Sequence, residues 1–325
     1  MRSPSTPIAL GIGLVAALNL CNASGLAPRR AQARGIAHRG VHQTFPAAGL
    51  DTTTCTAARI YPPTHGWIEN TLPAMQAAFE AGAGAVELDV HLTADGHLVV
   101  LHDATLDCRT DGRGTPEEHT LAELRDLDLG YGYTADGGAS FPLRGTGRGL
   151  LVTLPEVFAR FAGRAFLIDV KSDQPEVGER VADALAVLPI EDRARQFVYG
   201  SPAAVARVAA RLPEVRTIDR PRIQRCLLAY EITGWLGHVP AVCADTLVLV
   251  PVDVAPLLWG FPRRLEARLA AVGSDLALMG PLEGETTTGI DDRALLAQVP
   301  PDFGGYVWTN RIEVVGPLLA GRGGE

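Results

Sequence analysis

Residues 72–91 read LPAMQAAFEAGAGAVELDVH, a helix-type stretch followed by a β-type stretch, and this order predicts the fold. The pair Leu72-Pro73 suits a helix start, because proline is tolerated in the first helical turn. The run 85–91 then alternates in the manner of a strand. We expect seven further strands, at residues 36–38, 165–171, 196–199, 215–219, 246–250, 276–279 and 305–308.

Helix-type stretches separate these strands, at residues 121–127, 154–161, 177–188 and 202–211. Alternating units predict a parallel sheet, and eight strands favour closure into an α/β fold, a (β/α)8 barrel of the TIM type. We expect two insertions, residues 41–67 after strand 1 and residues 226–242 before strand 6, to cover a site at the carboxyl ends of the strands. No Gly-x-Gly-x-x-Gly motif follows a strand, which argues against a dinucleotide site.

The first 33 residues are expected to be a targeting segment rather than part of the fold. Arg2 is followed by an apolar run, residues 8–20, which suits the hydrophobic region of a secretory signal peptide. An uncleaved membrane anchor is the alternative. In both cases we expect residues 34–325 to form a single barrel domain that is exported, either periplasmic or secreted.

Composition excludes some classes of function. With 47% hydrophobic residues among 325, the chain can bury a large core, so disorder is not its dominant state. Its formal net charge of -8 argues against nucleic acid as a partner, because such proteins normally present a basic face.

Cysteine usage agrees with export. Cys21 lies in the targeting segment, and the four cysteines that remain permit two disulfides in an exported chain. Of the three pairings, we favour Cys55 with Cys108 and Cys226 with Cys243, because each pair would constrain one long insertion. Four unpaired thiols are the alternative.

Three carboxylates are expected to face the inside of the barrel. Glu87 and Asp89 alternate along one strand and therefore share a face, and such a buried pair is costly without a cation. A hard divalent ion is its natural partner, and Asp169 on the strand 165–171 would add a third oxygen ligand. Lys171 shares the face of Asp169. It is the only lysine in the chain, which suggests a compact ammonium that contacts phosphate.

Two histidines are candidates for proton transfer. Asp95-Gly96 predicts a two-residue hairpin turn, which would bring Asp89 opposite His102. His38 precedes Arg39 at the end of the first strand, and an imidazole beside a guanidinium suits a phosphoryl substrate.

Taken together and in order, these motifs resemble the glycerophosphodiester phosphodiesterase family, within the phosphatidylinositol-phosphodiesterase-like superfamily of TIM barrels. The resemblance covers roughly residues 34–315. The matching residues are His38-Arg39-Gly40, Glu69-Asn70-Thr71-Leu72-Pro73, Glu87-Leu88-Asp89-Val90, Thr93-Ala94-Asp95-Gly96, His102-Asp103, the run 107–114 and Tyr306-Val307-Trp308-Thr309-Asn310.

The resemblance implies metal-dependent hydrolysis of a glycerophosphodiester to an alcohol and glycerol phosphate. It implies one divalent ion, Ca²⁺ or Mg²⁺, and a small-molecule partner. By motif, His38 and His102 are the acid–base pair. The resemblance implies that Glu87, Asp89 and Asp169 bind the metal. It implies that Arg39 and Lys171 contact the phosphate, and that Glu69 and Trp308 support the site.

One departure keeps the substrate class open. The family usually has Glu where this chain has Asp169, and an Asp there also resembles related enzymes of the phospholipase D type. Cleavage of a lysophospholipid or sphingolipid is therefore an alternative, with contact at a membrane surface. The apolar stretch 247–261 would bind the tail of a lipid substrate. Alternatively, it would form a core strand and the loop that follows it. A non-catalytic phosphate-ester binding protein is the alternative of another class, and two histidines argue against it.

Overall fold

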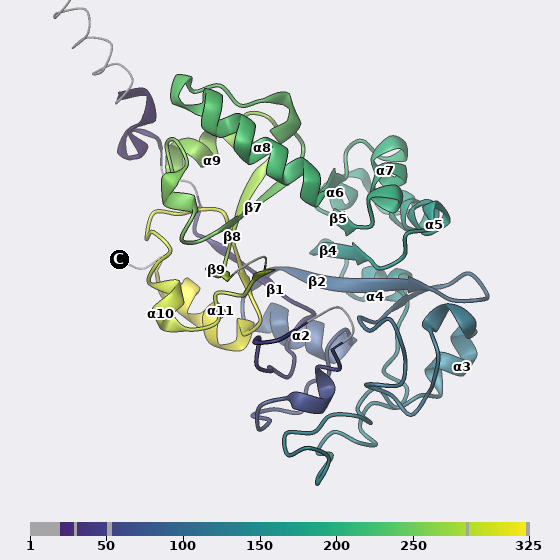
Figure 1. Ribbon diagram of the computed structural model, residues 1–325. Helices are drawn as coiled ribbons and strands as arrows, with labels where there is room; N and C mark the ends of the chain where they lie inside the picture. Colours follow the sequence, from purple (N-terminus) through teal and green to yellow (C-terminus); the bar gives the residue numbers. More distant parts are fainter. Residues whose placement is uncertain (1–19, 29–30, 51–53, 284–285, 323–325) are drawn as a thin grey trace, which may run out of the picture.

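The structure is a computed structural model that describes residues 20–28, 31–50, 54–283 and 286–322 (Figure 1). The predicted signal or anchor run lies, except for its last residue, outside these described residues. Among the described residues, no helix is long and apolar enough to cross a membrane.

Eight parallel strands form the barrel, and all eight coincide with predicted strands. Their order in the sheet is β6-β5-β4-β2-β1-β11-β8-β7. The ring is nearly closed, because Thr246 Oγ1 donates a hydrogen bond of 2.7 Å to the Thr217 carbonyl across the remaining gap. The bounds are β1 Arg34–Ala37, β2 Ala83–Leu92, β4 Ala165–Val170, β5 Phe197–Gly200, β6 Arg216–Thr217, β7 Leu247–Pro251, β8 Asp275–Met279 and β11 Tyr306–Thr309. The predicted barrel fold is confirmed.

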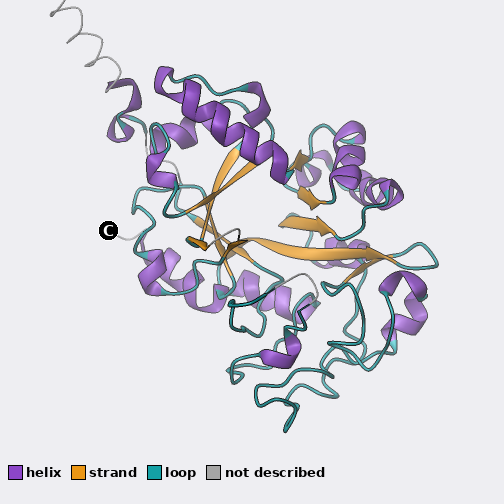
Figure 2. Cartoon of the chain, viewed as in Figure 1, coloured by secondary structure: helices purple, strands orange, loops and turns teal. Residues whose placement is uncertain are grey.

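Helices pack around the outside of the strands (Figure 2). The five predicted helices are present, with ends that differ by at most two residues. Threonine side chains cap three of them. At the start of α2, Leu72–Glu80, Thr71 accepts a hydrogen bond from the Ala74 amide. The others are α3 Leu121–Arg125, α4 Leu154–Arg160, α5 Pro175–Ala186, α6 Ile190–Arg193, α7 Pro202–Arg211, α8 Arg220–Thr233, α9 Arg263–Ala270, α10 Arg293–Leu296 and α11 Ile312–Gly321.

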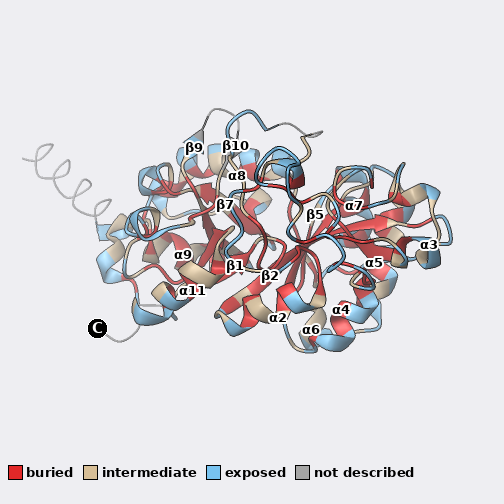
Figure 3. Ribbon diagram, turned by 90° about the horizontal axis from the view of Figure 1, so that it is seen from below, coloured by how far each residue is buried: buried red, intermediate tan, exposed pale blue. Residues whose placement is uncertain are grey.

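The inside of the barrel changes from apolar to polar along the strands. The strands are buried along most of their length (Figure 3). The layer near their amino ends is a buried apolar cluster that includes Ile36, Ala85, Leu167, Phe197 and Tyr306. Two residues further along each strand, the same face carries a polar or aromatic side chain, because alternate strand residues share a face. These positions are His38, Glu87, Asp169, Tyr199 and Trp308. The strands thus direct one polar layer to their carboxyl ends.

Two insertions build a separate small core beside that polar layer. One is residues 41–67, as predicted, with the short helix η2 Ala57–Arg59. The other lies between β2 and β4 and was not predicted as an insertion; it contains β3 Leu98–Val100, η3 Pro116–Glu118 and α3. Both contribute to one cluster of buried residues, namely Ala57, Ile60, Ile68, Val99, Leu101, Leu106, Leu124, Leu129, Tyr133, Leu143 and Leu151.

The prediction for residues 226–242 was wrong as to position. They form the second half of α8 and the turn η4 Gly234–Leu236, followed by η5 Ala241–Cys243, directly before β7. A segment that leads into a strand lies at the amino end of that strand, so this insertion is at the opposite end of the barrel from the polar layer. The stretch 247–261 is core strand β7 and an outer loop, which includes η6 Ala255–Leu257. Leu247 belongs to the apolar cluster inside the barrel, whereas Val248, Val250 and Leu258 belong to a second core cluster.

The β2–β3 hairpin differs by one residue from its predicted register. The Leu101 amide donates a hydrogen bond to the Asp89 carbonyl, so Leu101 rather than His102 lies opposite Asp89. The cause is a turn that is one residue longer than predicted. In it the Thr93 amide donates a hydrogen bond to the His97 carbonyl, and Gly96 adopts φ +82°. His102 therefore comes one residue after the paired arm.

Both favoured disulfides are present. Cys55–Cys108 joins the two insertions across 5.5 Å between Cα atoms, and Cys226–Cys243 joins α8 to η5 across 5.0 Å. The first therefore links two insertions rather than closing one.

Candidate active site

A cluster of three carboxylates lies at the carboxyl ends of two neighbouring strands. Glu87 and Asp89 come from β2 and Asp169 from β4, with Asp89 directly beside Asp169 in the parallel register. One oxygen from each lies within 4.8 Å of the other two. Glu87 is fully buried, and Asp89 and Asp169 are nearly so. The structure thus brings together the three residues predicted to bind metal.

The carboxylates differ in charge preference because their neighbours differ. Burial, reinforced by the Asp89 carboxylate, holds the pKa of Glu87 well above its ordinary value. Burial alone would also raise the pKa of Asp89, but Lys171, His102 and Arg39 together bring it well below the ordinary value. Asp89 is therefore the firmly ionised member of the cluster.

This donor set fits a hard divalent cation. Two oxygen ligands of one Ca²⁺, each about 2.3–2.6 Å from the ion, lie at most about 5 Å apart. The three candidate oxygens meet that limit. Glycine at position 200 keeps the space open, because a Cβ there would lie 2.5 Å from Asp169 Oδ1 and 2.4 Å from the Val170 carbonyl oxygen.

Lys171 lies at the edge of the carboxylate cluster. Its Nζ is 2.8 Å from Asp89 Oδ1 and donates to Asp169 Oδ2. Although burial opposes it, these two carboxylates raise the pKa of the ammonium, so it stays charged. The only lysine of the sequence thus forms ion pairs with two of the three carboxylates.

His38 is held in one tautomer by its neighbours. Its Nδ1 lies 2.6 Å from Asn310 Oδ1, and its Nε2 accepts a hydrogen bond of 3.1 Å from Arg39 Nε. The proton is therefore on Nδ1 and the lone pair on Nε2. Burial, assisted by the Arg39 charge, lowers the pKa of His38 well below its ordinary value. The Trp308 ring packs on the imidazole at 5.3 Å between centroids.

Arg39 connects His38 to the carboxylates. It adopts φ 55°, a left-handed conformation that is rare for a residue with a side chain. Its amide donates to Glu87 Oε2 at 3.0 Å, and its guanidinium pairs with Glu69 at 3.0 Å. Asn70, also left-handed at φ 59°, donates 2.8 Å to Asp89 Oδ2. Strained backbone here fixes side chains around the carboxylate cluster.

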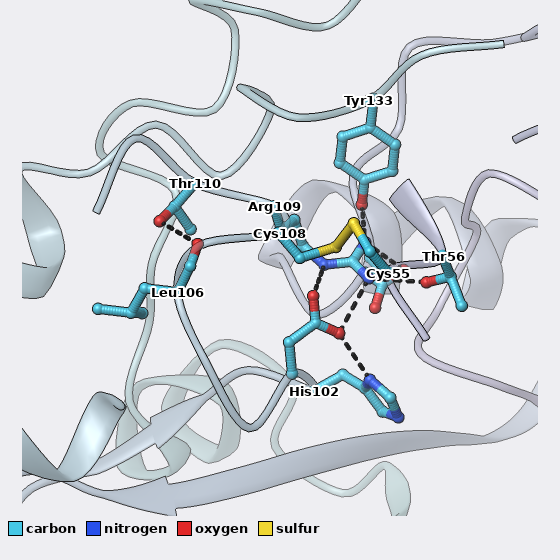
Figure 4. The surroundings of a disulfide bond; sticks show 10 residues. Cys55, Thr56, His102, Leu106, Cys108, Arg109, Thr110 and Tyr133 are labelled. Carbon is cyan, nitrogen blue, oxygen red and sulfur yellow. Dashed lines mark hydrogen bonds and ion pairs between the residues drawn. A yellow bond between two sulfur atoms is a disulfide. The ribbon is translucent and has the colours of Figure 1, made fainter. Parts of the chain in front are cut away.

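His102 is oriented by a buried ion-pair network (Figure 4). Its Nδ1 lies 2.9 Å from Asp103 Oδ1, and Arg109 binds both oxygens of that carboxylate at 3.0 and 3.1 Å. Burial opposes the charge of Asp103, but Arg109 and His102 keep its pKa below the ordinary range. Arg109 also pairs with Glu69 at 2.8 Å, so one chain of charges links the two histidines.

The Cys55–Cys108 disulfide supports this network. Cys108 precedes Arg109, and Cys55 precedes Thr56, whose hydroxyl accepts a hydrogen bond of 3.1 Å from Arg109 (Figure 4). Arg109 also donates to the Tyr133 hydroxyl. The disulfide thus fixes both chain segments that position the guanidinium behind Asp103.

We expect the double variant Cys55→Ser/Cys108→Ser to lower kcat about tenfold with little change in KM, because the orientation of His102 is loosened. The matched control is Cys226→Ser/Cys243→Ser. In the chain-entropy model, the Cys55/Cys108 variant opens a loop of 53 residues and loses about 4 kcal/mol of stability. The control opens a loop of 17 residues and loses about 3 kcal/mol. Steady-state kinetics below both melting transitions are the measurement, and equal kcat values in the two variants would contradict a positioning role.

Comparison with known proteins agrees with this geometry. The sequence model described as the glycerophosphoryl diester phosphodiesterase family matches residues 38–221, more than half of the chain. The chain belongs to this family.

Relatives within the family cover part of the chain. A glycerophosphodiester phosphodiesterase of Caldanaerobacter subterraneus subsp. tengcongensis is 36% identical over 131 residues, which is 38% of this chain and 50% of the relative. One from Bacillus altitudinis is 33% identical over 142 residues, 41% of this chain and 54% of the relative. The chain thus spans about half the length of these curated relatives.

Solved structures of the family share the fold. The glycerophosphoryl diester phosphodiesterase domain of a Mycobacterium tuberculosis protein aligns with a TM-score of 0.60 at 16% identity, over 88% of this chain and 99% of the domain. An Oleispira antarctica phosphodiesterase, solved with the product sn-glycerol-3-phosphate, aligns with a TM-score of 0.54 at 18% identity, over 89% and 97%. At such identities the likeness establishes the barrel.

Some residues around the site were not predicted as site residues. The Tyr199 hydroxyl donates a hydrogen bond of 2.6 Å to Glu87 Oε1. Burial near Asp169 and Glu87 raises the pKa of this hydroxyl. Its place at the end of a predicted strand was a usable signal. Asn70 and Asn310 lie within the family motifs. Nothing in the sequence around Arg109 indicated its role, because its hydrogen-bond partners are 6 to 53 residues away in sequence.

Proposed function

We propose that the protein hydrolyses a glycerophosphodiester to an alcohol and glycerol phosphate in a metal-dependent reaction. The observation that carries this proposal is the pair of histidines next to the carboxylate cluster, each oriented by a dedicated partner. His38 is held by Asn310 and His102 by Asp103. A phosphate-ester binding protein needs charges, whereas two oriented imidazoles are suited to proton transfer.

Glu87, Asp89 and Asp169 would hold the ion, Ca²⁺ or Mg²⁺. When bound, the ion supplies Lewis acidity toward the phosphoryl oxygens of the substrate. Lys171 and Arg39 lie at the same cluster, so their charges would stabilise the phosphodiester and the negative charge that develops on it.

His38 is the general base of this proposal. Its neutral imidazole carries the lone pair on Nε2, as the bonds to Asn310 and Arg39 require. That nitrogen would take the proton of the attacking hydroxyl, which belongs to water or to the neighbouring hydroxyl of the glycerol group. Because Asn310 is in turn held by Asp291 at 2.9 Å, the ring keeps this orientation.

His102 is the general acid. The Asp103 carboxylate fixes the ring through its contact with Nδ1, and Arg109 keeps that carboxylate ionised and in place. Nε2 of His102 would give its proton to the oxygen of the leaving alcohol as the P–O bond breaks. In this proposal His38 takes the proton of the attacking hydroxyl, and His102 gives a proton to the leaving oxygen on the other side of the phosphorus atom.

We expect Lys171→Arg to lower kcat/KM about tenfold, or about 1.4 kcal/mol, although it preserves the charge. The reason is geometric, because the ammonium reaches both Asp89 and Asp169 and a planar guanidinium is broader. Lys171→Met should lose more. Steady-state kinetics at saturating metal test this, and a wild-type kcat/KM for Lys171→Arg would remove the close-contact role.

We also propose that the domain is exported. Two disulfides support this location, because such bonds persist in oxidising compartments. Treatment of intact cells with a reductant and a thiol-alkylating reagent, neither of which crosses the membrane, followed by mass analysis, measures exposure of the chain. Protection of the chain in intact cells and labelling only after lysis would contradict export.

Substrate class is tested by product identification. The full chain is incubated with glycerophosphocholine, glycerophosphoethanolamine and lysophosphatidylcholine, and products are identified by mass spectrometry. We expect glycerol phosphate and the free alcohol from the first two. Exclusive cleavage of the lysophospholipid would support the lipid-directed alternative instead, and binding without product would support the non-catalytic one.

A further inference from the structure

Exposed apolar side chains gather on the outer face of α8 and the turns next to it. Leu228 and Ile232 are four residues apart, and Trp235 follows three later, so they share one helical face. The Trp259 indole donates 3.1 Å to the Glu231 carbonyl, which brings its loop against the same helix. We call this set the apolar face; its members are Leu228, Ile232, Trp235, Leu236, Leu257 and Trp259, between 37% and 73% exposed.

The apolar face lies toward the end of the barrel opposite to the active site. Helix α8 starts after the carboxyl end of β6 and ends in η4, which leads to the amino end of β7. Glu231, which bonds Trp259, is in the last turn of α8. Catalytic side chains, by contrast, stand at the carboxyl ends of the strands.

The beginning of the described chain is attached beside this face. Asn22 donates 2.8 Å to the Trp235 carbonyl, and Arg268 donates 2.9 Å to the Cys21 carbonyl. Leu20, 60% exposed, is the first described residue and ends the apolar run 8–20 of the sequence. The described chain therefore begins next to η4, near α8 and α9 (Figure 1).

We propose that the apolar face rests on a lipid bilayer in which the run 8–20 is inserted. That run is shorter than the roughly 20 residues a spanning helix needs, and a weak single anchor binds stably only with a second membrane contact. Trp235 and Trp259 provide such a contact, because tryptophan favours the membrane–water interface. Cys21 and Asn22, which directly follow the run, bond beside the apolar face, so a bilayer that holds the run would also meet this face.

This arrangement turns the active site away from the lipid. Given the proposed function, the site would then take a water-soluble glycerophosphodiester that arrives from the aqueous side, and not a lipid from the supporting bilayer. The orientation itself depends only on the apolar face and the N-terminal run, so it can be tested without measuring turnover.

Tryptophan quenching by brominated lipid tests the orientation. The full chain is reconstituted in vesicles of phosphatidylglycerol and phosphatidylcholine with brominated acyl chains, and fluorescence is compared with unbrominated vesicles. The run 8–20 contains no Trp, so its insertion gives no signal. We expect quenching in the wild type and at least a threefold smaller quenched intensity in Trp235→Phe/Trp259→Phe. Trp67→Phe is the matched control, since Trp67 is 40% exposed, as Trp259 is at 41%, and belongs to the insertion at the other end.

Other outcomes overturn the proposal. Quenching that Trp67→Phe abolishes would place the active-site end on the bilayer. Absence of quenching while the chain still floats with the vesicles would mean that only the N-terminal run binds lipid. Cross-linking between copies through the apolar face, with no quenching, would assign the face to a second copy of the chain. Unchanged melting temperatures show that the Phe variants remain folded.

Discussion

Replacing Asp89 with Asn is expected to lower kcat/KM by about 10³-fold or more, equivalent to about 4 kcal/mol of transition-state stabilisation. The substitution keeps the shape of the side chain and removes the firmly ionised member of the carboxylate cluster. It also leaves the Lys171 ammonium without its 2.8 Å partner. Steady-state kinetics on glycerophosphocholine, together with metal content per chain by atomic emission, are the measurements.

A loss of activity through misfolding is separated by two controls. Asp183→Asn removes an exposed carboxylate on α5, where its ion pair with Arg211 contributes little, and should leave kcat/KM unchanged. Circular dichroism of Asp89→Asn should remain that of the wild type. Full activity together with normal metal content in folded Asp89→Asn would show that Asp89 is not a ligand.

The second large effect is expected at the histidines. His38→Gln and His102→Gln should each lower kcat on a glycerophosphodiester of an ordinary alcohol by about 10²- to 10⁴-fold, because each removes one proton-transfer group. They should differ when the leaving alcohol is replaced by an acidic phenol, which departs without protonation. On such a substrate we expect His102→Gln to recover most of its activity and His38→Gln to recover none.

This comparison of leaving groups decides the assignment of roles. Recovery in His38→Gln and none in His102→Gln would reverse the acid and base. Equal recovery in both variants would contradict the assignment of His38 as base and His102 as acid, which rests on their partners Asn310 and Asp103. His119→Gln is the matched control, because that histidine is on the surface outside the site and bonds the Arg113 carbonyl.

Much of the site could be predicted from the sequence because it follows from strand periodicity. Glu87 and Asp89 share a face by alternation, and the end of the next strand brings Asp169 beside them. The same alternation places His38 at the end of β1. These residues are local to strands, and the parallel barrel brings all strand ends to one rim.

What could not be predicted depends on contacts between distant segments. Arg109 acquires its role only when the two insertions pack and Cys55 meets Cys108, 53 residues away. The hairpin register was wrong because a turn with one more residue competes with the two-residue turn that Asp95-Gly96 suggests. The placement of residues 226–242 was wrong because a roof requires a segment that follows a strand, whereas this one precedes β7.

The most direct test of a metal-dependent phosphodiesterase is turnover of glycerophosphocholine by the same preparation before chelation, after removal of divalent ions, and after addition of Ca²⁺ or Mg²⁺. Phosphorus NMR identifies the product while metal content is measured in parallel. We predict that glycerol phosphate formation stops when the ion is removed, and returns as about one ion per chain is restored. Undiminished formation of glycerol phosphate by the metal-free chain would contradict the account.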